Sequence, residues 1–411
     1  MNLPADLLLL GRVAVNFHRS SGFRLCMILS ENRTMLFRIM PRLEPWMSAH
    51  NPMPRSAWIF PALAVLLFAA VSATDYVFTL SFGGLVFATV LLAILFGTVF
   101  AAVHHAEVIA ERVGEPYGTL VLTLSVTIIE VALITTIMLG DKPAPALARD
   151  TVFAVVMIVC NGLVGLCIFI GGLRYREQGF QLSGANVYLS VLFALATITL
   201  IMPNYTTTAP GPIYSAVQLG FVDVVTLALY AVFLYTQTVL HKDYFVHERA
   251  EGEGGEVHLS IGALALTVVL LLVSLLAVVL LAKKFSLVVD AVGATIGAPP
   301  AFAGLLVALL ILMPEGVAAI AAARRNDLQK SINLALGSSL ATIGLTIPAV
   351  GVATYALDKE LELGLSAQGS VLLLLTFFLS MLTFGTGRTN VLFGLVHMVV
   401  FAVYVFMVFV P

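Results

Sequence analysis

Two glutamates stand out because each lies in a segment that is otherwise apolar enough to cross a bilayer. Glu130 lies within residues 118–138, and Glu315 lies within residues 304–320. A carboxylate at membrane depth costs about 2.5–3.5 kcal/mol on insertion scales, and such residues usually mark a path for ions or protons. Because the two glutamates occupy matching places in the two halves of the chain, they predict a shared site for a cation or a proton.

Hydroxyl and amide side chains nearby can complete a cation site. Ca²⁺ takes about six to eight oxygen ligands, and two carboxylates supply at most about four. Thr127 lies one helical turn before Glu130 on the same face, with Thr123 a turn further away. The spans that follow the two glutamates add more polar groups. The expected supporting ligands are Thr127, Thr123, Asn161, Ser338 and Ser339. Pro314 has no backbone N–H, so it also frees a carbonyl one turn before it.

Such a pair of carboxylates can couple a cation to protons. Burial and mutual repulsion make it difficult for both groups to stay ionised in an empty site. A bound cation restores the ionised form, so cation and proton compete for the same oxygens, and the two groups titrate as a unit. We expect a loaded or protonated site to reorient and an empty, doubly charged site not to.

The composition indicates an integral membrane protein. The 411 residues are 60% hydrophobic and 11% charged, the mean hydropathy is +1.03, and soluble proteins carry about 25% charged residues. Long apolar runs favour helices over a barrel. No basic recognition motif points to nucleic acid. The expected partners are inorganic cations, protons and the lipid bilayer, with no cofactor. Cys26, Cys160 and Cys167 lack metal-site spacing and are expected to be ordinary apolar side chains.

Eleven segments are long enough to span a membrane, since a span needs roughly 20 apolar residues. They cover residues 57–74, 77–104, 117–139, 151–173, 187–202, 216–240, 259–282, 302–323, 332–357, 367–384 and 390–410. The second and seventh are expected to continue as long tilted helices to Glu111 and Thr295. The prediction is an all-α membrane protein with one extra N-terminal helix and two five-helix repeats, over residues 77–240 and 259–411.

The connections between these spans predict the orientation of the chain. Lys and Arg are retained on the cytoplasmic side of membranes. With alternating spans, most basic residues fall on one side, namely Arg55, Arg174, Arg176, Lys242, Arg249, Arg324, Arg325, Lys330 and Arg388. We therefore expect an inner-membrane protein with a cytoplasmic N-terminus and an external C-terminus. Residues 241–258 read as an acidic cytoplasmic linker, and residues 1–53 as a basic arm with little fixed structure.

The two halves form an internal repeat. A shift of 185 positions takes Glu130 to Glu315, and polar segments recur around both. The span with Glu130 runs outward and the span with Glu315 runs inward, so the repeats are inverted, as in many secondary transporters. The polar helix end at Glu107 and Glu111, with Asp290 in a similar place in the second half, is a possible route into the site.

Four further segments, taken in order, give the chain a family resemblance over about residues 78–410. They are residues 105–118, 171–178, 336–339 and 387–390. With them the chain resembles the cation/calcium exchanger superfamily, and within it the bacterial calcium/sodium:proton antiporters. The resemblance implies an antiporter that exports Ca²⁺, Na⁺ or K⁺ in exchange for H⁺. Proton-coupled calcium exchangers of this superfamily have an asparagine three residues before each repeat glutamate. Here Thr127 and Leu312 occupy those positions, which argues against strict calcium selectivity.

Two other readings remain open from the residues. Carboxylates can also line a passive cation channel, although inverted repeats and the lack of a filter motif favour a transporter. His104 and His105 with Glu107 and Glu111 have helical spacing that can bind zinc, which would suit a membrane-embedded metalloenzyme. A helix end at the cytoplasmic interface is the simpler interpretation. Asp223, within the sixth span, has no evident partner in the sequence.

Overall fold

Apolar composition produces helices here because backbone groups in lipid must be hydrogen-bonded within their own segment. The computed structural model describes residues 54–74, 78–114, 116–140, 144–245 and 261–410. Within these residues, eleven helices are long and apolar enough to cross a membrane, which confirms the predicted fold class. Residues 1–53, predicted as a basic arm, and most of the predicted linker over 241–258 lie outside the described residues.

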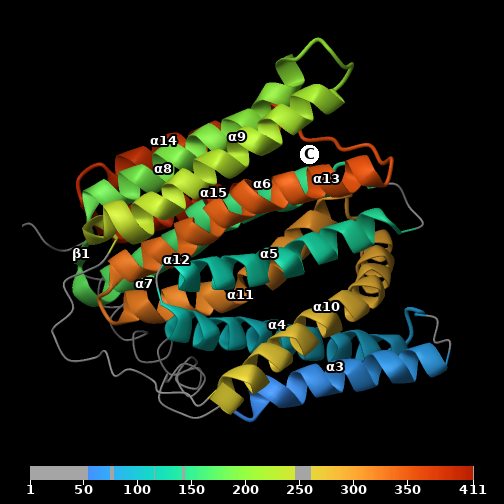
Figure 1. The fold of residues 1–411 in the computed structure, drawn as a ribbon. Helices are drawn as coiled ribbons and strands as arrows, with labels where there is room; N and C mark the ends of the chain where they lie inside the picture. Colours follow the sequence, from blue (N-terminus) through green and yellow to red (C-terminus); the bar gives the residue numbers. More distant parts are fainter. Residues whose placement is uncertain (1–53, 75–77, 115, 141–143, 246–260, 411) are drawn as a thin grey trace, which may run out of the picture. The chain divides into compact units, whose positions relative to one another are not determined.

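Five spans precede the linker, after one additional helix (Figure 1). The additional helix is α3 (Ser56–Ala73), and the five are α4 (Phe82–Val113), α5 (Tyr117–Met138), α6 with η3 and α7 (Leu147–Met157, Ile158–Leu163, Val164–Tyr175), α8 with η4 and η5 (Leu182–Ala196, Thr197–Ile201, Met202–Tyr205), and α9 with η6 (Ala216–Tyr235, Thr236–Leu240). The short helix η7 (Lys242–Tyr244) follows.

The second set of five spans repeats this order. It consists of α10 (Ile261–Ile296), α11 (Ala301–Arg324), α12 with η8 and α13 (Leu328–Ala341, Thr342–Thr346, Ile347–Ala356), α14 (Ala367–Phe384) and α15 (Val391–Phe409). A shift of 185 positions carries α5 onto α11 and the composite span α6–η3–α7 onto α12–η8–α13. Both composite spans contain a short π-helix, η3 in the first and η8 in the second, so the repeat extends to local backbone geometry.

Local signals set the ends of the long helix α4. Ser81 caps its start, since the side-chain oxygen accepts a hydrogen bond from the Gly84 N–H at 3.2 Å. This places the start at Phe82, five residues later than the predicted residue 77. The helix ends at Val113 because Gly114 takes a positive φ of 75°. The extension beyond residue 104 agrees with the predicted continuation to Glu111.

The two composite spans lie at the centre of the bundle. In the most apolar 18-residue stretch of each span, 78% is buried in the span containing η3 and 67% in the span containing η8, more than in any other span of the described residues. Helices α3, α4 and α10 pack together on one side of them, where α10 also contacts α5. Helix α15 packs on α7, and close approach of these two helices requires glycine: a Cβ at Gly394 would lie 2.6 Å from the Phe169 nitrogen.

The sequence analysis did not predict a small antiparallel sheet between the repeats. Strand β1 (Glu177–Gly179) pairs with β2 (Arg388–Asn390). Gln178 of β1 is 3% exposed, and its Nε2 donates to the Ala323 carbonyl at 3.2 Å and to Asn326 Oδ1 at 3.0 Å. The Tyr175 hydroxyl donates to the Arg324 carbonyl at 2.9 Å. These bonds satisfy carbonyls at the C-terminal end of α11, the helix that carries Glu315.

Candidate cation and proton site

Glu130 lies in the middle of α5 and is turned into the protein, with 1% of its surface exposed. Its Oε2 accepts two hydrogen bonds, from the Thr342 hydroxyl at 3.0 Å and from the Thr346 hydroxyl at 2.8 Å. The other oxygen, Oε1, is buried and has no hydrogen-bond partner among the described residues. Half of this carboxylate is therefore held by the second repeat, and half is free to bind a ligand.

The two threonines come from η8, the π-helix of the second repeat. They are four residues apart, and both are almost completely buried, with 2% and 0% exposure. A wider helical turn changes which side chains share a face, and π-helical turns are frequent at functional sites. Pro348, the second residue of α13, lacks the N–H that would bond the Gly344 carbonyl in a regular α-helix. The irregular backbone and the proline thus coincide with the segment that contacts Glu130.

Glu315 lies at the corresponding depth in α11. One of its oxygens, Oε2, is buried and has no hydrogen-bond partner among the described residues. The side chain as a whole is half-buried, and its charge interacts with the charges of Glu130 and Glu107. Glu315 is therefore close enough to Glu130 and to Glu107, near the C-terminal end of α4, for their charges to interact.

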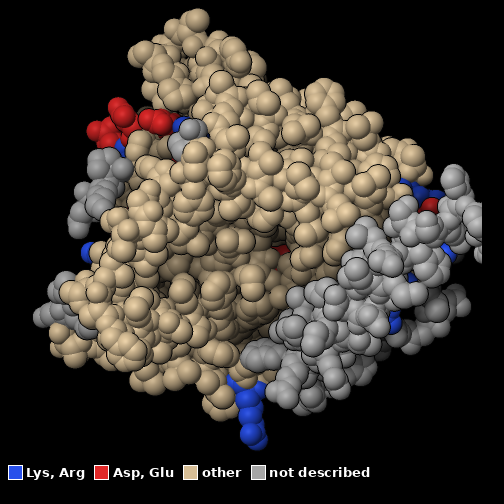
Figure 2. Space-filling model, turned by 180° about the vertical axis from the view of Figure 1, so that it is seen from behind, with Lys and Arg blue, Asp and Glu red and all other residues tan. Residues whose placement is uncertain are grey.

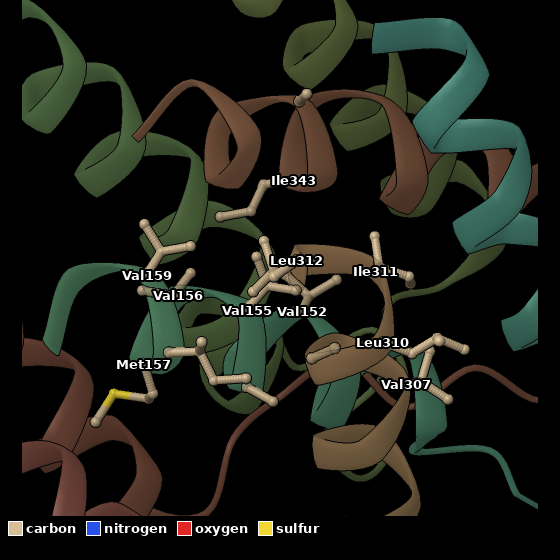
Figure 3. Close-up of a cluster of buried hydrophobic side chains, with 14 of the residues drawn as sticks. Val152, Val155, Val156, Met157, Val159, Val307, Leu310, Ile311, Leu312 and Ile343 are labelled. Atoms are coloured by element: carbon tan, nitrogen blue, oxygen red, sulfur yellow. The ribbon is translucent and has the colours of Figure 1, made fainter. Parts of the chain in front are cut away.

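Helix α11 continues through Pro314 without a break, from Ala301 to Arg324. The sequence analysis expected Pro314 to free a carbonyl one turn before it, and a helix interrupted at this point would expose more of the backbone. In the structure the irregular turns lie instead in the next spans, at η3 and η8. The side of α11 that carries Leu312 packs against apolar side chains of α6 and η8 (Figure 3).

Leu312 is of interest because it occupies one of the two positions that hold asparagine in calcium exchangers. It is 4% exposed and belongs to the same cluster of buried apolar side chains as Val155 of α6 (Figure 3). A close-packed apolar environment leaves no polar partner for an amide at this position. The other such position, Thr127, is 7% exposed, and its hydroxyl donates to the Thr123 carbonyl of its own helix at 2.8 Å.

The other predicted hydroxyl ligands, Thr123, Ser338 and Ser339, differ in their hydrogen bonds and in their burial. The Thr123 hydroxyl bonds the Thr119 carbonyl at 2.9 Å, and the side chain also bonds Tyr230 of α9. Ser339 is 0% exposed, and its hydroxyl has no hydrogen-bond partner among the described residues, whereas Ser338 is half-buried. The structure therefore leaves Ser339 as the one predicted hydroxyl that is both buried and uncommitted within the described chain.

Asn161 is turned away from Glu130. It lies in η3 with 0% exposure, and its Nδ2 donates to Thr376 Oγ1 at 2.8 Å. Its Oδ1 lies 3.1 Å from His397 Nδ1, and His397 Nε2 lies 2.9 Å from Thr383 Oγ1. The amide is thus bonded to α14 and α15. The position that matches Asn161 after the 185-residue shift is Thr346, which does contact a repeat glutamate.

Thr342 and Thr346 are the functional candidates that the sequence analysis missed. Their signal was present, because Ser338, Thr342 and Thr346 follow one another at four-residue spacing along one helical face. Their contact with Glu130 depends on how η8 packs against α5, and no local sequence pattern specifies that packing.

The possible route into the site is placed at one end of α4. Glu107 and Glu111 both have exposed side chains, although Glu107 also interacts with the buried Glu315, with Glu111 and with Lys330. An exposed side chain whose charge interacts with Glu315 is a candidate entry group. Figure 2 shows a hollow on one face of uncharged residues, with an acidic side chain at its bottom. Asp290 of α10 is half-buried and is not among the groups that interact with Glu315.

The histidines of α4 do not form a metal site with their acidic neighbours. His105 Nε2 lies 2.9 Å from the Ala57 carbonyl of α3, so this ring faces the additional helix. The His104 ring is tilted relative to the His105 ring, and the two ring centres are 5.8 Å apart. Within the described residues, no group of three or more His, Cys, Asp and Glu side chains is arranged to hold a metal ion. The placement of His105 favours a packing role over zinc chemistry.

Comparison with known proteins decides the family. The profile of the family described as "Sodium/calcium exchanger protein" matches residues 81–239 and 266–410, which together make up most of the chain and both repeats. The chain belongs to the sodium/calcium exchanger family. The resemblance to cation/calcium exchangers inferred from the sequence is thereby confirmed, and a transporter family replaces the metalloenzyme interpretation.

Two relatives in this exchanger family match almost end to end. The putative ionic transporter y4hA of Sinorhizobium fredii is 43% identical over 371 residues, covering 89% of this chain and 98% of the relative. The sodium-potassium/proton antiporter ChaA of Escherichia coli is 38% identical over 361 residues, covering 85% of this chain and 95% of the relative.

Solved structures support the same exchanger fold. The structure of native YfkE superposes with a TM-score of 0.66 at 17% identity, covering 86% of this chain and 100% of YfkE. The H⁺/Ca²⁺ exchanger CAX gives a TM-score of 0.62, also at 17% identity, covering 86% of this chain and 89% of CAX. At this level of identity the likeness concerns the fold alone.

Proposed function

We propose that this protein is a secondary cation:proton antiporter that exports Na⁺ or K⁺ in exchange for H⁺ across a bacterial inner membrane. The observation that carries the proposal is the state of the two repeat glutamates. Glu130 and Glu315 are close enough to interact, each has a buried oxygen without a hydrogen-bond partner among the described residues, and Glu130 is positioned by two hydroxyls. The name of the ChaA relative, a sodium-potassium/proton antiporter, supports the same exchange.

The available oxygens suit a monovalent cation better than Ca²⁺. A threonine hydroxyl that donates its hydrogen to Glu130 keeps lone pairs that can bind a cation. Thr342, Thr346 and the uncommitted Ser339 hydroxyl therefore join the two carboxylates as candidate ligands. Ca²⁺ usually requires about six to eight oxygens, many of them charged or carbonyl oxygens. The amide oxygens that would help to meet this requirement are absent at Thr127 and Leu312, so we expect the site to prefer Na⁺ or K⁺ to Ca²⁺.

Coupling follows from the charge of the site. Two ionised carboxylates in a low-dielectric interior repel each other, and the repulsion is relieved by a cation or by protons. Because both loads bind the same oxygens, they exclude each other. The site then switches between facing inward and facing outward only when it holds a cation or protons, and this condition gives exchange instead of leak. An inward proton gradient thereby drives cations outward.

The orientation is part of the proposal. Basic side chains at the ends of α7 and α11 and at the start of α12 support a cytoplasmic location for those ends, by the positive-inside rule. The same side contains the C-terminal end of α4 with Glu107 and Glu111. The possible route from Glu107 toward Glu315 would then begin at the cytoplasm, with a cytoplasmic N-terminus and an external C-terminus.

The experiment is a cation-induced proton flux assay in everted membrane vesicles. A fluorescent pH probe reports lumenal acidity while Na⁺, K⁺ and Ca²⁺ are added in turn. We expect Na⁺ or K⁺ to release protons from vesicles that contain the wild-type protein and not from vesicles without it. Glu130→Gln and Glu315→Gln should each abolish the response, because a neutral amide cannot alternate between a proton and a cation.

A matched control separates this effect from a general loss of acidic charge. Glu177→Gln changes an exposed glutamate of β1 and should leave the flux unchanged. Protein amounts in the vesicles are compared by immunoblot. Exchange that persists in either repeat-glutamate variant, or a flux that does not saturate and ignores the pH gradient, as in a channel, would refute the proposed mechanism.

A further inference from the structure

Asp223 is a half-buried acidic group that the exchange site at Glu130 and Glu315 does not use. It lies in α9, within a span, where a carboxylate is unfavourable unless it has a function. The side chain is half-buried, and its Oδ1 is buried with no hydrogen-bond partner among the described residues. It therefore resembles the repeat glutamates in having an oxygen that no described group satisfies.

The neighbouring helix provides space for this carboxylate. A Cβ placed on Gly351 of α13 would lie 2.6 Å from Asp223 Oδ2 and 3.1 Å from Oδ1, so glycine at this position lets the carboxylate lie against the α13 backbone. Seven residues further along α9, the Tyr230 ring covers Gly344 of η8, where an added Cβ would lie 2.6 Å from the ring. Gly344 is itself seven residues before Gly351. The two segments thus pack antiparallel and in register, with a pair of glycines accepting a pair of α9 side chains.

Further oxygen groups lie along this interface between Asp223 and Glu130. Thr226 is one turn after Asp223 on the same face, has 0% exposure, and its Oγ1 has no hydrogen-bond partner among the described residues. The Gly344 carbonyl loses its usual α-helical donor because Pro348 has no N–H. Thr346, in the same π-helix, donates to Glu130. The α9 face with Asp223 and Thr226 therefore packs on the segment that holds Glu130.

Asp223 lies toward the opposite side of the membrane from Glu107. It lies in the first half of α9 and faces Gly351 in the middle of α13, whereas Glu107 is near the C-terminal end of α4. In the proposed orientation the α9 start is external and the α4 end is cytoplasmic. The repeat glutamates would thus have one acidic group toward each aqueous phase.

We propose that Asp223 is an external proton-binding site that transfers protons between the outer aqueous phase and Glu130, an inference that rests on the proposed antiport. The Asp223 carboxylate takes a proton from external water. Because neither Asp223 Oδ1 nor Thr226 Oγ1 has a hydrogen-bond partner among the described residues, water carries the proton between them: Asp223 gives it to a water molecule, the water passes a proton to the Thr226 hydroxyl oxygen, and the hydroxyl releases its own proton toward η8 and Glu130. One proton moves in each cycle, both groups return to their starting forms, and no other reactant is needed.

The surroundings of Asp223 contain few other groups that could bind this proton. The elements in main contact with α9 are α13, η8, η6 and α8. Within these described elements the titratable side chains are tyrosines, Tyr188 of α8 and Tyr355 of α13, in addition to Tyr230 and Tyr235 of α9 itself. The Tyr188 hydroxyl is engaged by Gln237 Nε2 at 2.8 Å. Asp223 is therefore the acid at this interface.

The test varies the pH on the lumenal side of everted vesicles, which corresponds to the external side of the cell. Rates of cation-induced proton release are measured for Asp223→Asn and Thr226→Val at lumenal pH values on both sides of neutrality. We expect both variants to be slower than wild type by at least about tenfold, as for loss of a positioned proton-transfer group, with a flattened dependence on lumenal pH. The half-saturating cation concentration should stay at the wild-type value, and Asp223→Glu should restore the lumenal pH dependence.

Controls make each outcome decisive. Thr236→Val removes an α9-span hydroxyl that bonds only its own helix, at the Val232 carbonyl, and should behave as wild type. Thr226→Val loses no hydrogen bond of the described structure, so it carries the test if Asp223→Asn does not assemble. Wild-type rates and pH profiles in both variants would overturn the proposal, as would a changed half-saturation with an unchanged pH profile. Absence of flux in the wild-type protein would instead refute the antiport itself.

Discussion

Replacement of Thr346 by valine tests the hydrogen bonds that position Glu130. Valine keeps the shape of threonine and removes the hydroxyl that donates to Glu130 Oε2 at 2.8 Å. A hydrogen bond to a charged group contributes about 1.5–3 kcal/mol. At about 1.4 kcal/mol for each tenfold change, its loss should raise the half-saturating Na⁺ or K⁺ concentration by about 10- to 150-fold. Thr342→Val, with a donor at 3.0 Å, should act in the same direction.

The physical reason is that these donors stabilise the ionised carboxylate, which is the form that binds a cation. Without them the protonated form competes better, and one candidate oxygen ligand is lost as well. The two donors share one acceptor oxygen, so the double variant should lose less than the sum of the single changes. Thr346→Ser, which keeps the hydroxyl, should retain most of the wild-type affinity.

The assay is the cation dependence of proton release in everted vesicles, repeated as cation binding to purified protein by calorimetry. Thr354→Val is the matched control, because Thr354 is also a buried threonine of the same composite span. Its hydroxyl bonds the Val350 carbonyl of its own helix at 2.9 Å. The reasoning is wrong if Thr346→Val keeps the wild-type half-saturation, or if Thr354→Val shifts it equally.

Two other predictions concern packing and access. Gly394→Ala should lower the thermal midpoint of the detergent-purified protein, because the new Cβ would lie 2.6 Å from the α7 backbone and overpacking typically costs about 1–3 kcal/mol. Gly220→Ala is the control and should leave the midpoint unchanged, since a Cβ there would meet no atom within 4 Å. Equal midpoints of the two variants would contradict the close-packed interface. Glu107→Cys should react quickly with a membrane-impermeant maleimide in everted vesicles and slowly in intact cells. Fast labelling in intact cells only would reverse the proposed orientation.

The fold was largely predictable because span length and apolar composition are properties of single segments. All eleven spans, and the long extensions of α4 and α10, follow from runs of hydrophobic residues. The short strands β1 and β2 were missed because each has three residues and forms only by pairing with a segment about 210 positions away. A prediction from local pattern contains no information about such a partner.

The site shows the same division between local and long-range information. Glu130 and Glu315 were found because a charge in an apolar run is conspicuous by itself. The direction of the Asn161 side chain was not predictable, since it depends on the π-helix η3 and on His397 of α15. Thr342 and Thr346 were passed over in favour of Ser338 and Ser339 because the choice of helical turn that meets Glu130 is made by packing between helices.

Strands β1 and β2 have a consequence for how the molecule can rearrange. Strand β1 connects α7 to α8 in the first repeat, and β2 connects α14 to α15 in the second. Sliding α8 past α15 would break this pairing, and Gln178 ties the end of α11 to the same place. The ends of α7, α8, α11, α14 and α15 at this sheet should therefore move together as one rigid body. A hinge would then have to cross both repeats, and it could not simply separate the first repeat from the second.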